Sequence, residues 1–125
     1  MFEEARAIEA VIQLYFDGLY EGSTAKLALA FHPCVRLYFT DAGAVRELPR
    51  AEWFSLVEGR PAPAARQLAR TDKIAWVDVA HNAAVAKVEC SIAPRYFTDY
   101  LTFLKTDQGW QIVSKASRIE VREHE

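Results

Sequence analysis

The stretch 95–118 most constrains how this chain can fold. Its two halves read as long strands, and Asp107, Gln108 and Gly109 between them have the composition of a hairpin turn. A one-residue slip would move every side chain to the other face of the sheet, so the residue pattern also indicates the register. We expect a long β-hairpin whose three-residue loop is closed by Thr106 and Trp110.

In this register one face of the hairpin is mostly apolar. Its expected pairs are Phe103 with Val113, Leu101 with Lys115, Asp99 with Ser117, and Phe97 with Ile119. The expected pairs on the opposite face are Leu104 with Ile112, Thr102 with Ser114, Tyr100 with Ala116, and Thr98 with Arg118. A slip by one residue would set Phe97 against Glu120 and mix the two faces.

Helices are expected before the strands. Apolar residues recur at helical spacing from Phe2 to Glu21, which predicts an amphipathic helix lying on a core. The element expected next is a short helix that is capped by Ser23 or Thr24, runs through Phe31 and is ended by Pro33. A hairpin formed by 36–40 and 45–48 and a helix at 50–58 should follow. The proline-containing segment 59–65 reads as a surface loop.

The rest of the chain reads as strand. We expect strands at 67–80 and 83–92 around a tight turn at His81 and Asn82, then a break at Ala93 and Pro94 before the long hairpin. This order predicts an α+β fold in which three helices cover one face of a curved antiparallel sheet. With 125 residues, of which 51% are hydrophobic, the chain suits one domain spanning 1–125.

Charge and cysteine content exclude several classes of function. The formal net charge is -2 and no block of like charges occurs, so nucleic acid and anionic membranes are poor partners. No apolar run reaches the length of a membrane span, and the first four residues are acidic, unlike a signal peptide, which indicates a cytoplasmic protein. Cys34 and Cys90 lack the spacing of a zinc site or of a disulfide framework, so we expect buried free thiols, no metal and no cofactor.

Both faces of the sheet carry apolar residues. With Ala80 opposite Ala83, the expected pairs are Val79 with Ala84, Val77 with Ala86, Trp76 with Lys87, Ala75 with Val88, and Ile74 with Glu89. Three helices can cover only one face, and soluble monomers rarely expose an apolar face of several strands. We therefore expect a homodimer formed through the other face.

Three segments carry a resemblance to a known family. They are Tyr15 to Gly18 on the first helix, Ala30 to Pro33 after the second, and the long stretch Phe97 to Lys115. Together with the order of elements, they resemble the nuclear transport factor 2-like superfamily, and within it the putative lumazine-binding branch next to the SnoaL-like cyclases. The resemblance implies a cone-shaped, cystatin-like α+β barrel, a pocket between helices and sheet, and frequent homodimers. It implies little about chemistry, because this fold hosts enzymes, binders and accessory domains.

The catalytic residues of related enzymes are missing from this chain. Ketosteroid isomerases, which the fold resembles, place an aspartate base on the first strand after the second helix. The corresponding stretch here is 37–40, which has no carboxylate, and Asp41 comes only at the turn. Chemistry like that of scytalone dehydratase would need histidines in the pocket. Of the three histidines only His32 is well placed, because His81 lies in a turn and His124 near the end of the chain.

Asp99 and Lys115 are the first candidate site residues. Asp99 lies on an apolar stripe, and Lys115 is placed diagonally so that its side chain can reach the carboxylate. The two can form a pocket-floor pair that orients a ligand or moves a proton, or an ion pair at a dimer face. Because the strands are interrupted at Ala93 and Pro94, the sequence does not show whether Asp99 lies on the pocket face or on the dimer face of the sheet.

His32 and four aromatic residues complete the candidate site. His32 can act as an acid or base in the pocket, or it can cap the preceding helix. Tyr15, Tyr38, Trp53 and Tyr100 can form a cage for a flat ligand, or they can simply pack in the core. We expect the pocket mouth at Tyr15, His32, Tyr38 and Trp53. Lys87 and Glu89 are expected as surface or interface charges.

Three functions from different classes remain open. The first is a small-molecule-binding protein with an aromatic-lined pocket and an unknown ligand. The second is a cofactor-independent dehydratase, isomerase or cyclase in which His32 and Asp99 carry the acid-base chemistry. The third is a dimerisation module without a ligand. An ordered network of titratable groups within one cavity would favour the second over the third.

Overall fold

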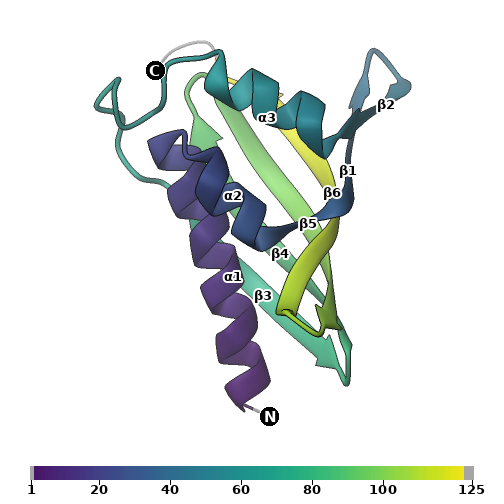
Figure 1. The fold of residues 1–125 in the computed structure, drawn as a ribbon. Helices are drawn as coiled ribbons and strands as arrows, with labels where there is room; N and C mark the ends of the chain where they lie inside the picture. The colour runs from purple at the N-terminus through teal and green to yellow at the C-terminus, as the bar shows by residue number, and fades with distance from the viewer. Residues whose placement is uncertain (1, 123–125) are drawn as a thin grey trace.

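The computed structural model describes residues 2–122, which form three helices and six strands. In chain order the elements are α1 (Phe2–Glu21), α2 (Thr24–Ala30), β1 (Phe31–Asp41), β2 (Ala44–Pro49), α3 (Arg50–Glu58), β3 (Lys73–Ala80), β4 (Ala83–Ile92), β5 (Arg95–Thr106) and β6 (Gly109–Val121). The helices α1 and α2 lie across one face of the curved sheet, and α3 lies over its upper end (Figure 1). The expected α+β fold is confirmed.

The sheet is open and mixed. Its strand order is β2-β1-β6-β5-β4-β3, so β2 and β3 are the two edges. Every neighbouring pair is antiparallel except β1 and β6, which run parallel. The expectation of antiparallel pairing throughout is wrong for this pair. The chain enters β1 from α2 and not through a hairpin with β6, so no turn sets the relative direction of these strands.

The long hairpin has the expected register except near its turn. Asp99 pairs with Ser117 and Leu101 with Lys115, as predicted. Beyond Thr102 the register shifts by one, so Phe103 pairs with Ile112, and only Asp107 and Gln108 remain in the loop. The expected partners Val113 for Phe103 and Ile112 for Leu104 are therefore wrong. Val113 is the extra residue of a β-bulge, and this bulge lets Ile112 and Lys115, three positions apart, both be buried.

The hairpin of β3 and β4 has a similar irregularity. Its register is as expected from Ala80 to Trp76, but a bulge follows, so that Ile74 pairs with Val88. The expected pairs of Ala75 with Val88 and Ile74 with Glu89 are wrong for this reason. The strand also begins at Lys73 and not at 67, because Gln67 has a positive φ of 58° and lies in a segment closed by turn hydrogen bonds.

The short helix α2 begins as expected and ends early. The Ser23 side chain caps it by accepting a hydrogen bond from the Lys26 backbone N–H. The helix ends at Ala30, because Phe31 adopts an extended backbone and buries its ring completely. Phe31 is thus the first residue of β1, and His32 lies on a strand.

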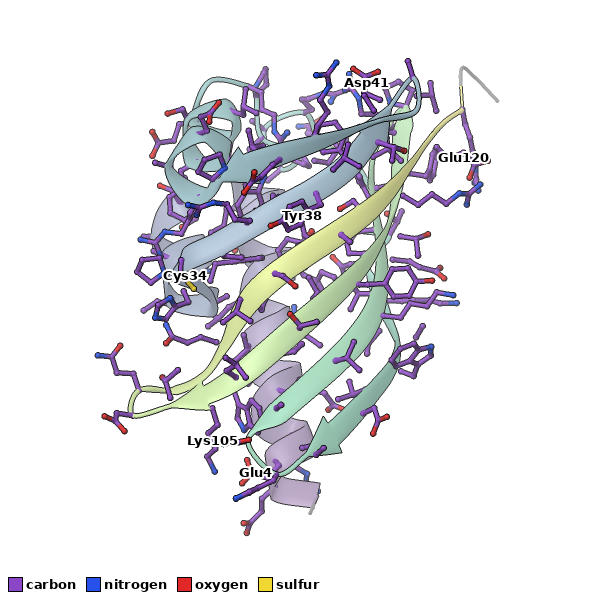
Figure 2. All side chains as sticks on the ribbon, turned by 90° about the vertical axis from the view of Figure 1, so that its right-hand side faces the viewer. Glu4, Cys34, Tyr38, Asp41, Lys105 and Glu120 are labelled. Carbon is purple, nitrogen blue, oxygen red and sulfur yellow. The ribbon has the colours of Figure 1, made fainter. Side chains whose placement is uncertain are left out.

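The core lies between the helices and the inward face of the sheet. At the N-terminal end of α1, the Glu4 carboxylate accepts hydrogen bonds of 2.7 Å from Trp110 Nε1 and from Lys105 Nζ, which ties the helix to the tip of the long hairpin (Figure 2). At the other end of α1, the Tyr20 hydroxyl donates to the Leu68 carbonyl at 2.6 Å. In the described part of the chain, no helix has both the length and the apolar character needed to cross a membrane.

Candidate functional site

A cavity of about 560 Å³ opens between the helices and the upper part of the sheet. Its size falls within the usual range of small-molecule sites. α1, α3, the loop after α3 and strands β1, β2, β4, β5 and β6 contribute to its wall. Most of the wall is apolar, formed by Leu19, Leu37, Phe39, Leu48, Leu56, Ile92, Phe97 and Ile119, and the cavity can therefore hold an apolar ligand body.

A chain of four hydrogen-bonded side chains lies at the inner side of this cavity. Lys115 Nζ donates to the Tyr15 hydroxyl oxygen at 2.9 Å, and the Tyr15 hydroxyl donates to Asp99 Oδ2 at 2.5 Å. The Ser117 hydroxyl donates to Asp99 Oδ1 at 2.7 Å. Lys115, Tyr15 and Ser117 line the cavity, whereas Asp99 is 0% exposed and lies behind them. We call these four residues the buried polar chain.

The position of Asp99 follows from strand pairing. On β5 it alternates with Leu101 and Phe103, both buried, and its partner on β4 is the buried Val88. Asp99 therefore faces the helices, where it meets Tyr15 of α1. The sequence left open whether Asp99 lies on the helix side of the sheet or on a dimer face, and the structure shows it on the helix side.

Burial controls the ionisation of this group of residues. Desolvation, and secondarily the negative charge of Asp99, raise the pKa of Tyr15 well above its usual value. Desolvation also lowers the pKa of Lys115, although the charge of Asp99 opposes this effect. The nearby buried thiol of Cys90 has its pKa raised to about 12, mainly by burial and next by Asp99. Lys115 thus releases its proton more readily than a surface lysine does.

Lys115 has spare hydrogen-bonding capacity. Its Nζ lies 4.3 Å from the ring centre of Trp53 and 4.8 Å from that of Tyr15, which stabilises the ammonium by cation–π attraction. An ammonium carries three donors, and within residues 2–122 Tyr15 accepts the one hydrogen bond that Nζ makes. The remaining donors are available to an acceptor atom of a ligand in the cavity.

The arrangement supports two kinds of chemistry. Lys115 can donate hydrogen bonds to a ligand, while Asp99, acting through Tyr15, balances its charge and fixes its position. The buried polar chain can also move a proton between Lys115 and Asp99 through the Tyr15 hydroxyl. In the described residues no group of three or more His, Cys, Asp or Glu side chains is arranged to hold a metal ion.

The structure brings together several of the residues predicted from the sequence. Tyr15, Trp53 and Lys115 line the cavity, and Asp99 supports two of its lining residues. Tyr38 also borders the cavity, but strand alternation puts its side chain on the opposite face of β1 from the buried Leu37, and Tyr38 is 37% exposed. It belongs to the side of the sheet that Figure 2 presents to the viewer.

Two predicted residues lie away from the cavity. His32 is not among its lining residues, so the expected place of His32 at the mouth is wrong. Its Nδ1 instead accepts a hydrogen bond from the Cys34 backbone N–H at 3.0 Å, because the early end of α2 puts His32 on β1. Cys34 is exposed on the same strand, so the expectation of a buried thiol is wrong for Cys34, whereas Cys90 is buried. Tyr100 is 43% exposed on the outer face of the sheet beside Lys87, so it cannot join an aromatic cage. His81 lies in the turn between β3 and β4, and His124 lies outside the described residues.

The sequence did not reveal three polar residues of the cavity wall. Ser117 was expected only as the partner of Asp99, and Arg60 and Arg95 were not considered. Arg60 follows α3 in a loop and Arg95 follows the turn at Pro94, so no periodic pattern marks either residue. Only the folded chain brings these two arginines to the same cavity.

Comparison with known proteins gives consistent matches. A family model described as "Putative lumazine-binding" matches residues 3–117. An NTF-2 like protein of unknown function from Silicibacter pomeroyi DSS-3 is 26% identical with a TM-score of 0.84, over 94% of this chain and 97% of that one. An NTF2-like protein of unknown function from Shewanella baltica OS155 is 23% identical with a TM-score of 0.87, over 97% of both chains.

A third solved structure identifies the same fold under another description. An NTF2-like protein with a cystatin-like fold from Novosphingobium aromaticivorans is 21% identical with a TM-score of 0.67, over 93% of this chain and 81% of that one. No curated protein matches the chain. The family model thus shows the family, and the solved structures share the fold.

Proposed function

The chain belongs to the "Putative lumazine-binding" family of NTF2-like proteins, and from this premise we propose that it binds a small molecule in the cavity between its helices and its sheet. The observation that carries the proposal is the buried polar chain at the inner side of a cavity of about 560 Å³. Sites for small molecules combine an apolar wall with a few fixed polar groups, and Lys115 and Ser117 are such groups here.

The buried polar chain would be costly if it had no role. Asp99 and Lys115 are 0% and 7% exposed, and removing charged groups from water is unfavourable unless they are paired and hydrogen-bonded. A well-packed apolar cluster would stabilise the same fold at least as well. A ligand that accepts hydrogen bonds from Lys115 gives a physical reason to keep the buried polar chain. This argues against a dimerisation module without a ligand.

Native mass spectrometry of the protein purified from its own cells tests the proposal. We expect a bound compound on the wild type and its loss from Lys115→Met, which removes the amine and keeps most of the side-chain length. Lys87→Met, on the outer face beside Tyr100, is the matched control and should retain the compound. A wild type without any bound compound, or a compound retained by Lys115→Met, would contradict the proposal.

A second candidate function is acid-base catalysis without a cofactor. Three titratable side chains, Lys115, Tyr15 and Asp99, are connected by hydrogen bonds at one cavity, which is the arrangement that proton transfer requires. In this case Lys115 or Tyr15 would touch the substrate, and Asp99 would act through Tyr15. Incubating the recovered compound with fresh protein distinguishes the two functions, because an enzyme converts it and a binding protein returns it unchanged.

The proposal includes a homodimer formed through the outer face of the sheet. Trp76 of β3 and Tyr100 and Leu104 of β5 are 46%, 43% and 46% exposed there. Val85 of β4 and Val113 of β6 line a shallow groove together with Leu104. Apolar residues gathered over several strands favour association.

Free Cys34 and Cys90 fit a reducing compartment, and we propose the cytoplasm as the location.

A further inference from the structure

All charged residues that line the cavity are positive. The described lining residues include Arg60, Arg95 and Lys115, and they include no aspartate or glutamate. The chain as a whole carries 17 acidic against 15 basic side chains, so this excess of positive charge is local. The cavity therefore attracts negative charge in a protein whose net charge would repel it.

The two arginines have no acidic partner in the described part of the chain. Within residues 2–122, neither Arg60 nor Arg95 forms an ion pair. In contrast, five other arginines each lie within ion-pair distance of a carboxylate, namely Arg36, Arg46, Arg70, Arg118 and Arg122. Arg60 and Arg95 are thus two arginines that no carboxylate within residues 2–122 pairs with, and both line the same cavity.

The arginines also influence each other. Arg60 is exposed as a residue, yet desolvation of its guanidinium lowers its pKa, and the positive charge of Arg95 lowers it further, while Tyr15 acts in the opposite direction. The charge of Arg60 also contributes to the lowered pKa of Lys115. Arg60, Arg95 and Lys115 also line one cavity, so a single ligand that fills this cavity can contact all three.

Asp99 does not neutralise the arginines. Both of its oxygens accept hydrogen bonds from within the fold, Oδ2 from Tyr15 and Oδ1 from Ser117, and the residue is 0% exposed. Its charge is balanced by Lys115 through Tyr15. The positive charge left over is at Arg60 and Arg95, which are exposed and therefore stand at the open side of the cavity.

We propose that the ligand is a small organic anion with an apolar body. Its acidic group, a carboxylate, sulfonate or phosphate, lies between Arg60 and Arg95, because guanidinium groups match the geometry of such oxygens. Its body lies along Leu37, Phe97 and Ile119, and an acceptor atom on the body receives a hydrogen bond from Lys115. This inference rests on the proposed function, since it names the class of molecule that the same cavity binds.

A pair of fluorescent probes separates the charge from the apolar body. The first probe is 8-anilinonaphthalene-1-sulfonate, and the second is N-phenyl-1-naphthylamine, which has the same aromatic rings without the sulfonate. We expect the wild type to bind the anionic probe about 10-fold more tightly or better, as charge-assisted hydrogen bonds would give. The double variant Arg60→Gln, Arg95→Gln should lose this preference and keep its affinity for the neutral probe.

Two control variants complete the experiment. Arg6→Gln changes an exposed arginine of α1 and should keep the preference, and Tyr100→Ser with Leu104→Ser tests for probe bound on the outer face. Urea unfolding of each variant confirms that it folds. Equal affinity of the wild type for both probes would overturn the anion inference and leave the proposed function standing. If the wild type bound neither probe, both the proposed function and the anion inference would be overturned. If only the outer-face variant lost the anion preference, the anion inference would be overturned.

Discussion

The Tyr15 hydroxyl of α1 donates a 2.5 Å hydrogen bond to the carboxylate of Asp99 on β5, 84 residues further along the chain. This bond joins the helix layer to the sheet inside the core, and it places Tyr15 between Asp99 and Lys115. The Tyr15 hydroxyl is thus the donor to Asp99 Oδ2 and the acceptor of the Lys115 hydrogen bond. Both the stability of the fold and the chemistry of the cavity follow from this relationship.

Removal of the Tyr15 hydroxyl should destabilise the protein by about 1.5–3 kcal/mol, as expected for a buried hydrogen bond to a charged group. Tyr15→Phe keeps the ring and leaves Asp99 and Lys115 without the group that connects them. The measurement is the free energy of unfolding in urea. Tyr20→Phe is the matched control, because Tyr20 donates to a neutral backbone carbonyl and should lose only about 1 kcal/mol. Equal losses in the two variants would contradict this account of the buried polar chain.

Asp99→Asn should weaken small-molecule binding and leave dimer formation unchanged. The substitution keeps the shape of the side chain but removes the charge that balances Lys115, so we expect about a 10-fold loss of affinity for the compound that co-purifies with the protein. Asp99 faces the helices and is 0% exposed, so the affinity between subunits should stay the same. Weaker dimers with unchanged ligand binding would be the opposite result and would contradict the site.

Cys90 should make the protein less stable in alkaline solution. Its pKa is raised from 9.0 to about 12 in the folded state, so the unfolded chain loses the thiol proton first as the pH rises. The stabilisation from this proton is complete below pH 9.0 and is lost as the pH rises towards about 12. In this window the free energy of unfolding should fall by up to about 1.4 kcal/mol per pH unit.

Urea unfolding of Cys90→Ala between about pH 8 and about pH 10, in the presence of a reductant, measures this contribution. The variant should lose stability with pH less steeply than the wild type. Cys34→Ala, which changes the exposed cysteine, serves as the control and should keep the wild-type slope. A Cys90→Ala variant with the wild-type slope would show that the thiol is not buried as described.

Leu104→Lys should separate the proposed dimer into folded monomers. Leu104 is 46% exposed on the outer face of the sheet, where a lysine costs little in a monomer and much in an apolar interface. Light scattering at micromolar concentration gives the mass. Leu29→Lys is the matched control on the helix layer, since Leu29 is 66% exposed on α2. A monomeric wild type, or a dimer that survives Leu104→Lys, would count against this interface.

The sequence predicted the fold well where local pattern decides the structure. The three helices, the tight turn at His81 and Asn82, and most of the long hairpin follow from periodicity and turn residues. The bulge at Val113 could not be predicted, because Ile112 and Val113 are both apolar and either one satisfies the pattern opposite Phe103. The parallel pairing of β1 with β6 could not be predicted either, because no turn connects these strands.

The candidate site was predictable in part. Tyr15, Trp53, Lys115 and Asp99 were identified as polar or aromatic residues on apolar faces, and the fold brings these residues together. The face on which Asp99 lies follows from its pairing with Val88 of β4, and the residue pattern of β5 alone does not reveal this pairing. Arg60 lies in the loop after α3 and Arg95 at the start of β5, and only the folded chain brings both to one cavity. His32 was misplaced because the burial of Phe31 ended the preceding helix early.

The most direct test of the central claim is a crystal structure of the protein purified from its own cells without denaturation. We predict electron density for a small molecule in the cavity of about 560 Å³, with an acceptor atom within hydrogen-bond distance of Lys115 Nζ. Density for a compound only on the outer face of the sheet, or a cavity containing nothing but ordered water, would contradict the claim that this cavity is the binding site.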